Sequence, residues 1–127
     1  MTIIQKKSFK ITSALKEGYD PDGRIFTFQD AERAIANWIK DRLASGKPII
    51  SGLLQSGTLI FPAPEKSAES VSVSPTVIFT GELSSQEDIA RSDEEVGATL
   101  EGLGLTLKAA LRQESVYIIY LNKHWCV

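Results

Sequence analysis

The chain has 127 residues, a mass of 13.9 kDa and a formal net charge of −2 at neutral pH. This length fits one domain, and a hydrophobic fraction of 43% is that of a globular protein, which excludes a wholly disordered chain. The nearly balanced charge disfavours a dedicated nucleic-acid binder, since such proteins usually carry a basic excess. No apolar run approaches the ~20 residues that span a bilayer, so we expect no nucleic acid and no membrane among its partners.

Metal ligands and redox-active residues are scarce in the chain. Its single cysteine, Cys126, cannot form an internal disulfide, and its single histidine, His124, cannot supply a multi-histidine metal site. Residues 1–7 contain no apolar stretch of the kind that a signal peptide needs. We therefore predict a cytoplasmic protein with no metal and no cofactor.

The first half of the chain predicts a strand, a helix and a further stretch of strand. Residues 8–15 alternate between apolar and polar side chains, as a half-buried strand does. A turn-rich segment follows, and Thr27 then begins a helix that ends at residues 45–46. The helix has one apolar stripe, formed by Phe28, Ala31, Ile35, Trp38, Ile39 and Leu43. Residues 49–61 predict either one bulged strand or two strands bent around residues 55–57.

The second half repeats this order after a segment of different composition. Residues 62–75 are rich in proline and serine, and they predict either a loop or the irregular arm of a long hairpin. A strand follows at residues 76–80, and Ser92 with Glu95 forms a capping box at the start of a second helix of about five turns. Residues 116–121 are apolar at both alternating sets of positions, which predicts a last strand that is either central in the sheet or covered on both faces.

This order of elements predicts an α+β fold, a ferredoxin-like βαββαβ sandwich in a single domain, residues 1–127. We expect a four-stranded antiparallel sheet with two helices on one face and an inserted hairpin or loop. Two approximate repeat units, residues 8–61 and 76–121, are joined by the loop at residues 62–75. Close packing against the backbone of the second helix is indicated by its glycines, Gly97, Gly102 and Gly104.

The sheet face opposite the helices carries the functional prediction. The strands at residues 76–80 and 116–121 place apolar side chains on both faces, yet two helices cover only one of them. An uncovered face with Tyr117 and Ile119 would exceed the exposed apolar patch of a normal monomer. We therefore expect the chain to form a homo-oligomer through this face, or to fold residues 62–75 over it.

Candidate site residues follow from side-chain chemistry and from position at strand ends and turns. Five are predicted to bind a ligand: Tyr19, Arg24, Glu82, Tyr117 and His124. On an extended tail His124 and Cys126 point to the same side, where a Cys–His pair could act as nucleophile and base or form half of a metal site. No acidic residue is marked to orient this pair, so an ordinary terminal strand extension is favoured and no catalytic residue is assigned.

Three functions fit these predictions. The first is a small soluble binding or regulatory module, homo-oligomeric, that holds a small metabolite or a protein partner at the subunit interface. The second is a small ferredoxin-like enzyme with a pocket between the sheet and the helices. The third is a structural or interaction protein that docks a larger partner on its exposed sheet. A non-enzymatic role is favoured over an enzymatic one.

Overall fold

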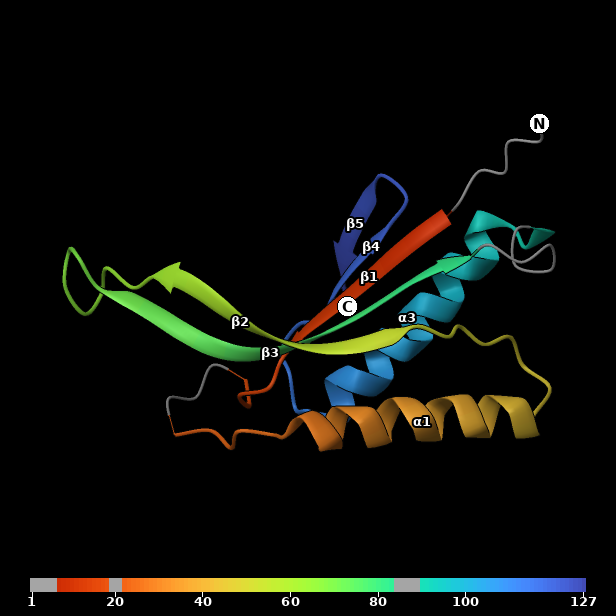
Figure 1. The fold of residues 1–127 in the computed structure, drawn as a ribbon, viewed down its shortest axis with the longest axis horizontal. Coiled ribbons are helices and arrows are strands. Elements are labelled where there is room, and N and C mark those ends of the chain that lie inside the picture. The colour runs from red at the N-terminus through yellow and green to blue at the C-terminus, as the bar shows by residue number, and fades with distance from the viewer. Residues whose placement is uncertain (1–6, 19–21, 84–89) are drawn as a thin grey trace.

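The computed structural model describes residues 7–18, 22–83 and 90–127, which form a five-stranded sheet and two long helices (Figure 1). The elements in chain order are β1 (Lys7–Ala14), α1 (Phe28–Ala44), β2 (Leu53–Pro62), β3 (Val71–Leu83), α3 (Asp93–Ala110), β4 (Tyr117–Tyr120) and β5 (Lys123–Cys126). Neighbouring strands pair antiparallel in the spatial order β2-β3-β1-β4-β5. The α+β class is therefore confirmed, whereas the predicted four-stranded sheet is wrong by one strand, because the tail of the chain forms β5.

Side-chain caps determine where both helices begin. Thr27 Oγ1 accepts a hydrogen bond from the Asp30 amide at 3.1 Å, and Asp30 Oδ2 accepts one from the Thr27 amide at 2.8 Å. At the start of α3, Ser92 Oγ accepts from the Glu95 amide at 3.1 Å, while the Glu95 carboxylate accepts from Arg91 Nε at 3.2 Å. The predicted caps are therefore present, although the acidic partner in α3 turns to Arg91. No helix of the described residues is long and apolar enough to cross a membrane.

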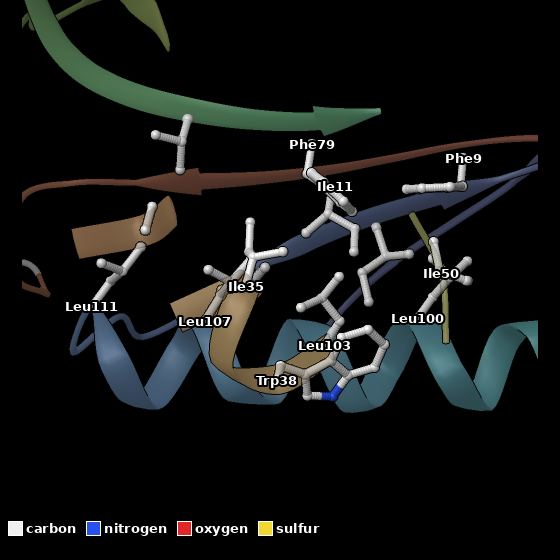
Figure 2. Packing of buried hydrophobic residues seen from close by; sticks show 14 of the residues in the cluster. Phe9, Ile11, Ile35, Trp38, Ile50, Phe79, Leu100, Leu103, Leu107 and Leu111 are labelled. Atoms are coloured by element: carbon white, nitrogen blue, oxygen red, sulfur yellow. The ribbon is translucent and has the colours of Figure 1, made fainter. Parts of the chain in front are cut away.

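Both helices pack on the same face of the sheet, and the core lies between these two layers (Figures 1 and 2). Phe9 and Ile11 of β1 face the helices together with Phe79 of β3, because alternate residues of a strand share a face. The rings of Phe9 and Phe79 lie 5.8 Å apart between centroids. The helices contribute the opposite half of the core with Ile35, Trp38, Leu100, Leu103 and Leu107. Burial of these side chains at about 25 cal/mol per Å² is the main stabilisation of the two layers.

One of the three helix glycines lies where a neighbouring element approaches the backbone. A Cβ atom on Gly104 would lie 3.0 Å from both Ile118 Cδ1 and Val127 Cγ2, which is tighter than ordinary contact. Gly102 makes only ordinary contact with α1, and Gly97 faces open space. The prediction of close packing is therefore confirmed at Gly104 and wrong at Gly97.

The hairpin of β2 and β3 extends past the end of the helix layer as an arm, which we define as residues 58–74 (Figure 1). Its turn is closed by the Ala63 amide, which donates to the Ser70 carbonyl at 2.9 Å. Of the two alternatives predicted for residues 62–75, the structure has the hairpin, and the loop is reduced to residues 63–70. Neither the predicted bend nor the predicted bulge occurs in the preceding strand, because β2 pairs with β3 without interruption.

The last residues form a second hairpin, made by β4 and β5. Leu121 adopts a φ of 56°, and the chain turns there so that Trp125 lies opposite Ile118 and His124 lies opposite Ile119. The predicted strand at residues 116–121 therefore ends at Tyr120, and the tail is an edge strand of the sheet instead of an extension of β4.

Candidate functional site

No described element covers the sheet face opposite the helices, which we call the open face (Figure 1). Residues of three strands alternate with core residues and point to this face: Lys10, Thr12, Ala14, Thr76, Ile78, Tyr117 and Ile119. Tyr117 is 57% exposed and Ile119 is 42% exposed. The prediction that these two side chains lie on an uncovered face is therefore confirmed.

One end of the open face contains a cavity of about 610 Å³, which we call the hollow. Its floor is made by β1 and β3, where Thr12 pairs with Ile78. Leu59 of the arm flanks the floor on one side and Tyr117 of β4 flanks it on the other, while residues 113–115 contribute from beyond the end of α3. The complete lining is Thr12, Ala14, Gly18, Thr58, Leu59, Thr76, Ile78, Gln113, Glu114, Ser115 and Tyr117.

Besides the hydroxyls of Thr12, Thr58, Thr76 and Ser115, the lining of the hollow offers an amide, a carboxylate and a phenol. Gln113 is only 9% exposed, and its Nε2 donates to the carbonyls of Lys16 at 2.7 Å and Leu111 at 2.8 Å. Glu114 brings an exposed carboxylate, and Tyr117 brings a phenol on an exposed ring. A largely apolar cavity with a few polar groups is the usual form of a site for a small organic ligand.

Of the predicted ligand-binding residues that the structure describes, Tyr117 alone lines the hollow. Glu82 lies farther along the open face, at a shallower depression of about 370 Å³. His124 is exposed on the edge strand β5. Arg24 lies in the loop before α1, with its guanidinium 4.5 Å from the centre of a phenylalanine ring. Tyr19 lies outside the described residues, so the structure does not bring the predicted set together.

Sequence reasoning missed most of the lining of the hollow. Gln113 and Glu114 follow the end of α3, where the apolar periodicity stops and nothing in the pattern selects them. A usable signal was present in β1, where the outward residues Thr12 and Ala14 are small. Small outward side chains on a half-buried strand leave space above the sheet, and that space is the floor of the hollow.

His124 and Cys126 lie on the same side of β5, as the spacing predicts, because they pair with Ile119 and Tyr117 of the open face. Cys126 is an exposed free thiol. Neither residue belongs to the lining of the hollow. Within the described ranges, no three His, Cys, Asp or Glu side chains gather closely enough to hold a metal ion.

A second polar cluster lies on the helix side of the sheet. Asp93 Oδ1 accepts hydrogen bonds from Lys7 Nζ and from the Tyr120 hydroxyl, each at 2.8 Å. These two hydrogen bonds hold the pKa of Asp93 below its ordinary value, and the bond from Lys7 has the larger effect. Burial, and after it the bond to Asp93, raises the pKa of Tyr120. The cluster joins β1, α3 and β4 and lies apart from the lining of the hollow.

No protein-family model and no curated protein sequence matches this chain. Solved structures do share its fold. A phage SAM lyase in complex with S-methyl-5′-thioadenosine superimposes with a TM-score of 0.66, covering 96% of this chain and 88% of that chain at 16% sequence identity. A phage SAM lyase in the apo state superimposes with a TM-score of 0.64, covering 95% and 87% of the two chains at 16% identity. Likeness at this level of identity defines a shared fold.

Proposed function

We propose that this chain is a small-metabolite-binding protein that works as a homo-oligomer and holds a thioadenosine nucleoside in the hollow. The observation that carries the proposal is the cavity of about 610 Å³ on the uncovered sheet face. Small-molecule sites usually occupy about 300–1,000 Å³ and are mostly apolar. The ligand class is suggested by the phage SAM lyase, in which a similar fold accompanies bound S-methyl-5′-thioadenosine.

The chemistry of the lining fits such a nucleoside. The exposed ring of Tyr117 offers a flat surface for a purine, and Ile78 with Leu59 offers apolar surface for a methylthio group. The hydroxyl of Thr12 and the carboxylate of Glu114 can bond ribose hydroxyls. A base, a sugar and a thioether therefore each have a matching surface in the hollow.

Two exposed apolar surfaces favour association between copies of the chain. Four residues of the arm are more than half exposed: Leu59, Ile60, Val71 and Val73. The open face exposes Tyr117 and Ile119 as well. A protruding arm and a concave face on one chain allow copies to join head to tail, and such contacts close into a ring when the rotation permits. Leu59 belongs both to the arm and to the hollow, so a copy that packs on this part of the arm also borders the ligand site.

Ligand binding is tested by titrating the purified protein calorimetrically with S-methyl-5′-thioadenosine and with S-adenosylmethionine. Ala14→Phe places a ring on the floor of the hollow without entering the core, and we expect it to weaken binding at least about tenfold. Leu43→Phe on the exposed surface of α1 is the control and should bind like the wild type. Failure of both nucleosides to bind the wild type would show that the proposal is wrong.

Association is tested by light scattering coupled to size exclusion. The double variant Ile60→Glu with Val73→Glu puts two charges on the arm, and we expect it to shift the protein towards monomer. Leu105→Glu removes an apolar residue of α3 that is also more than half exposed, and it should leave the assembly unchanged. A wild type that is monomeric at high concentration would contradict this part of the proposal.

The second candidate function is a lyase that breaks the bond between the sulfur and the amino-acid chain of S-adenosylmethionine. The electron pair stays on sulfur in S-methyl-5′-thioadenosine, and the substrate's own carboxylate bonds to the freed carbon to give a lactone. The likeness to phage SAM lyases favours this candidate. Glu114 lines the hollow, where its carboxylate could bind the positive sulfonium of that substrate. The hollow lies on the open face, not between sheet and helices where the sequence-based enzyme alternative placed its pocket. Chromatography of S-adenosylmethionine incubated with the protein tests this candidate, and Glu114→Gln should raise the KM at least about tenfold, because the carboxylate attracts the sulfonium of the bound substrate. If the protein binds S-adenosylmethionine but does not cleave it, the lyase candidate is wrong and the metabolite-binding function stands.

We also propose that the fold belongs with ferredoxin-like sandwiches. Its first four strands stand in the order β2-β3-β1-β4 with α1 and α3 on one face, and β5 is added at an edge.

The third function, an interaction protein that docks a larger partner, predicts the opposite results in the binding and association experiments: a monomer, and no response to either nucleoside.

A further inference from the structure

Three polar residues beyond the end of α3 line the hollow: Gln113, Glu114 and Ser115. Gln113 is the most buried of the three. We infer that it determines which base the protein accepts, because its Oε1 accepts a hydrogen bond from the 6-amino group of adenine. This inference rests on the proposed function and assigns a specificity-determining residue to the proposed site.

Two hydrogen bonds fix the orientation of the Gln113 amide. Nε2 donates to the Lys16 carbonyl at 2.7 Å and to the Leu111 carbonyl at 2.8 Å. Carbonyl oxygens can only accept, so both amide protons are used and Oε1 must point away from these two partners. Turning the amide over would leave two carbonyls facing an oxygen in a site where the side chain is only 9% exposed.

The oxygen of this amide is left as an open acceptor. Across the described residues, no group donates to Gln113 Oε1. Nor is Gln113 Oε1 fully buried. Among the described residues, the side-chain polar atom that is both buried and without a hydrogen-bond partner is Trp125 Nε1. Gln113 belongs to the lining of the hollow, and we take the accessible side of Oε1 to face that cavity. An acceptor that cannot turn into a donor selects a ligand that brings an N–H or O–H group.

The neighbouring side chains assign this acceptor to the base. Tyr117 offers the flat surface on which a purine stacks, and it lines the same hollow. Glu114 is more exposed than Gln113 and so suits the ribose hydroxyls, which keep contact with solvent. Adenine presents a 6-amino donor, whereas hypoxanthine presents a 6-oxo acceptor that would face Gln113 Oε1 without a proton between them.

The experiment compares S-methyl-5′-thioadenosine with 5′-methylthioinosine, which carries oxygen in place of the 6-amino group. We expect the wild type to bind the inosine compound at least about tenfold more weakly. Gln113→Met should weaken binding of the adenosine compound until the two affinities are nearly equal. Glu114→Gln is the matched control, which should weaken both compounds alike and leave their ratio unchanged.

Equal affinity of the wild type for the two compounds would overturn the inference and leave the proposed function intact. A ratio that persists in Gln113→Met would also overturn it, since another group would then read the base. Failure of both compounds to bind would remove the proposed function and the inference with it. If Gln113→Met does not fold, the inference is judged by the ratio of the wild type's affinities for the adenosine and inosine compounds.

Discussion

Asp93 is a single carboxylate through which three elements of the fold are connected. It begins α3 and accepts hydrogen bonds from Lys7 of β1 and Tyr120 of β4. An acidic residue in the first turn is also favoured by the positive end of the helix dipole. Because every one of these interactions favours the charged form, the pKa of Asp93 is lowered from the ordinary 3.8. The stability of the fold must therefore depend on pH through this residue.

We predict that Asp93→Asn destabilises the protein near neutral pH and that the difference disappears in acid. The folded pKa lies below the unfolded 3.8, so the stabilisation is complete above that pH and is lost as the pH falls through the lower folded value. Thermal unfolding of both proteins at several pH values checks this, and their midpoints should converge as the pH falls below 3.8. Glu94→Gln, the neighbouring exposed acid of α3, should show a smaller difference near neutral pH.

The bond to Asp93 also gives a direct prediction for Tyr120. Tyr120→Phe keeps the buried ring and removes the hydroxyl that donates at 2.8 Å, so we expect a loss of about 1.5–3 kcal/mol in unfolding free energy. Urea denaturation measures the change. Tyr117→Phe is the control because that ring is 57% exposed, and a loss of similar size there would argue against the role given to the buried bond.

At the scale of elements, local signals predicted the helices well and the hairpins poorly. The cap at Thr27 and the apolar stripe of α1 lie within one segment, so the sequence alone indicates where that helix lies. The arm depends on pairing instead, because Val71 and Val73 alternate with serines that resemble a loop until β2 lies beside them. The turn before β5 needs a positive φ at Leu121, which no residue preference indicates.

The hollow could not be predicted for a related reason. Its lining combines Thr12 of β1, Leu59 of the arm and Gln113 beyond α3, residues that only the sheet order brings together. Tyr117 was predictable because it lies on a strand that is apolar on both faces. Topology therefore decides which polar residues converge, while periodicity within a segment decides only which face each residue takes.

The two faces of the sheet should respond differently to substitution. Leu107→Ala opens a cavity in the core between α3 and the sheet, and we expect it to cost about 2–5 kcal/mol of unfolding free energy. Ile119→Lys changes the open face, where the side chain is 42% exposed, and should alter the stability of the subunit by less than about 0.5 kcal/mol while shifting the assembly towards monomer. Denaturation and light scattering of both variants separate the effects, and a large loss of subunit stability in Ile119→Lys would contradict the division of the two faces.

For the molecule as a whole, the arm and the open face pose a problem that one subunit does not solve. The arm projects beyond the helix layer (Figure 1). It exposes apolar residues on both of its sides, Leu59 and Ile60 among them. Large exposed patches of this kind in a folded chain usually mark an interface. If the interface forms between copies, part of the stability of each subunit comes from its neighbours.

We therefore predict that the melting temperature of the wild type rises with protein concentration, because association stabilises the folded state by mass action. The arm variant Ile60→Glu with Val73→Glu should melt at one temperature across the same dilution series, since it lacks the apolar contact. Addition of S-methyl-5′-thioadenosine at about 100 times its dissociation constant should stabilise the wild type by about 2.7 kcal/mol, and the arm variant by less if the neighbouring copy borders the hollow. A wild type whose melting temperature ignores concentration would show that the arm and the open face serve something other than a second copy of this chain.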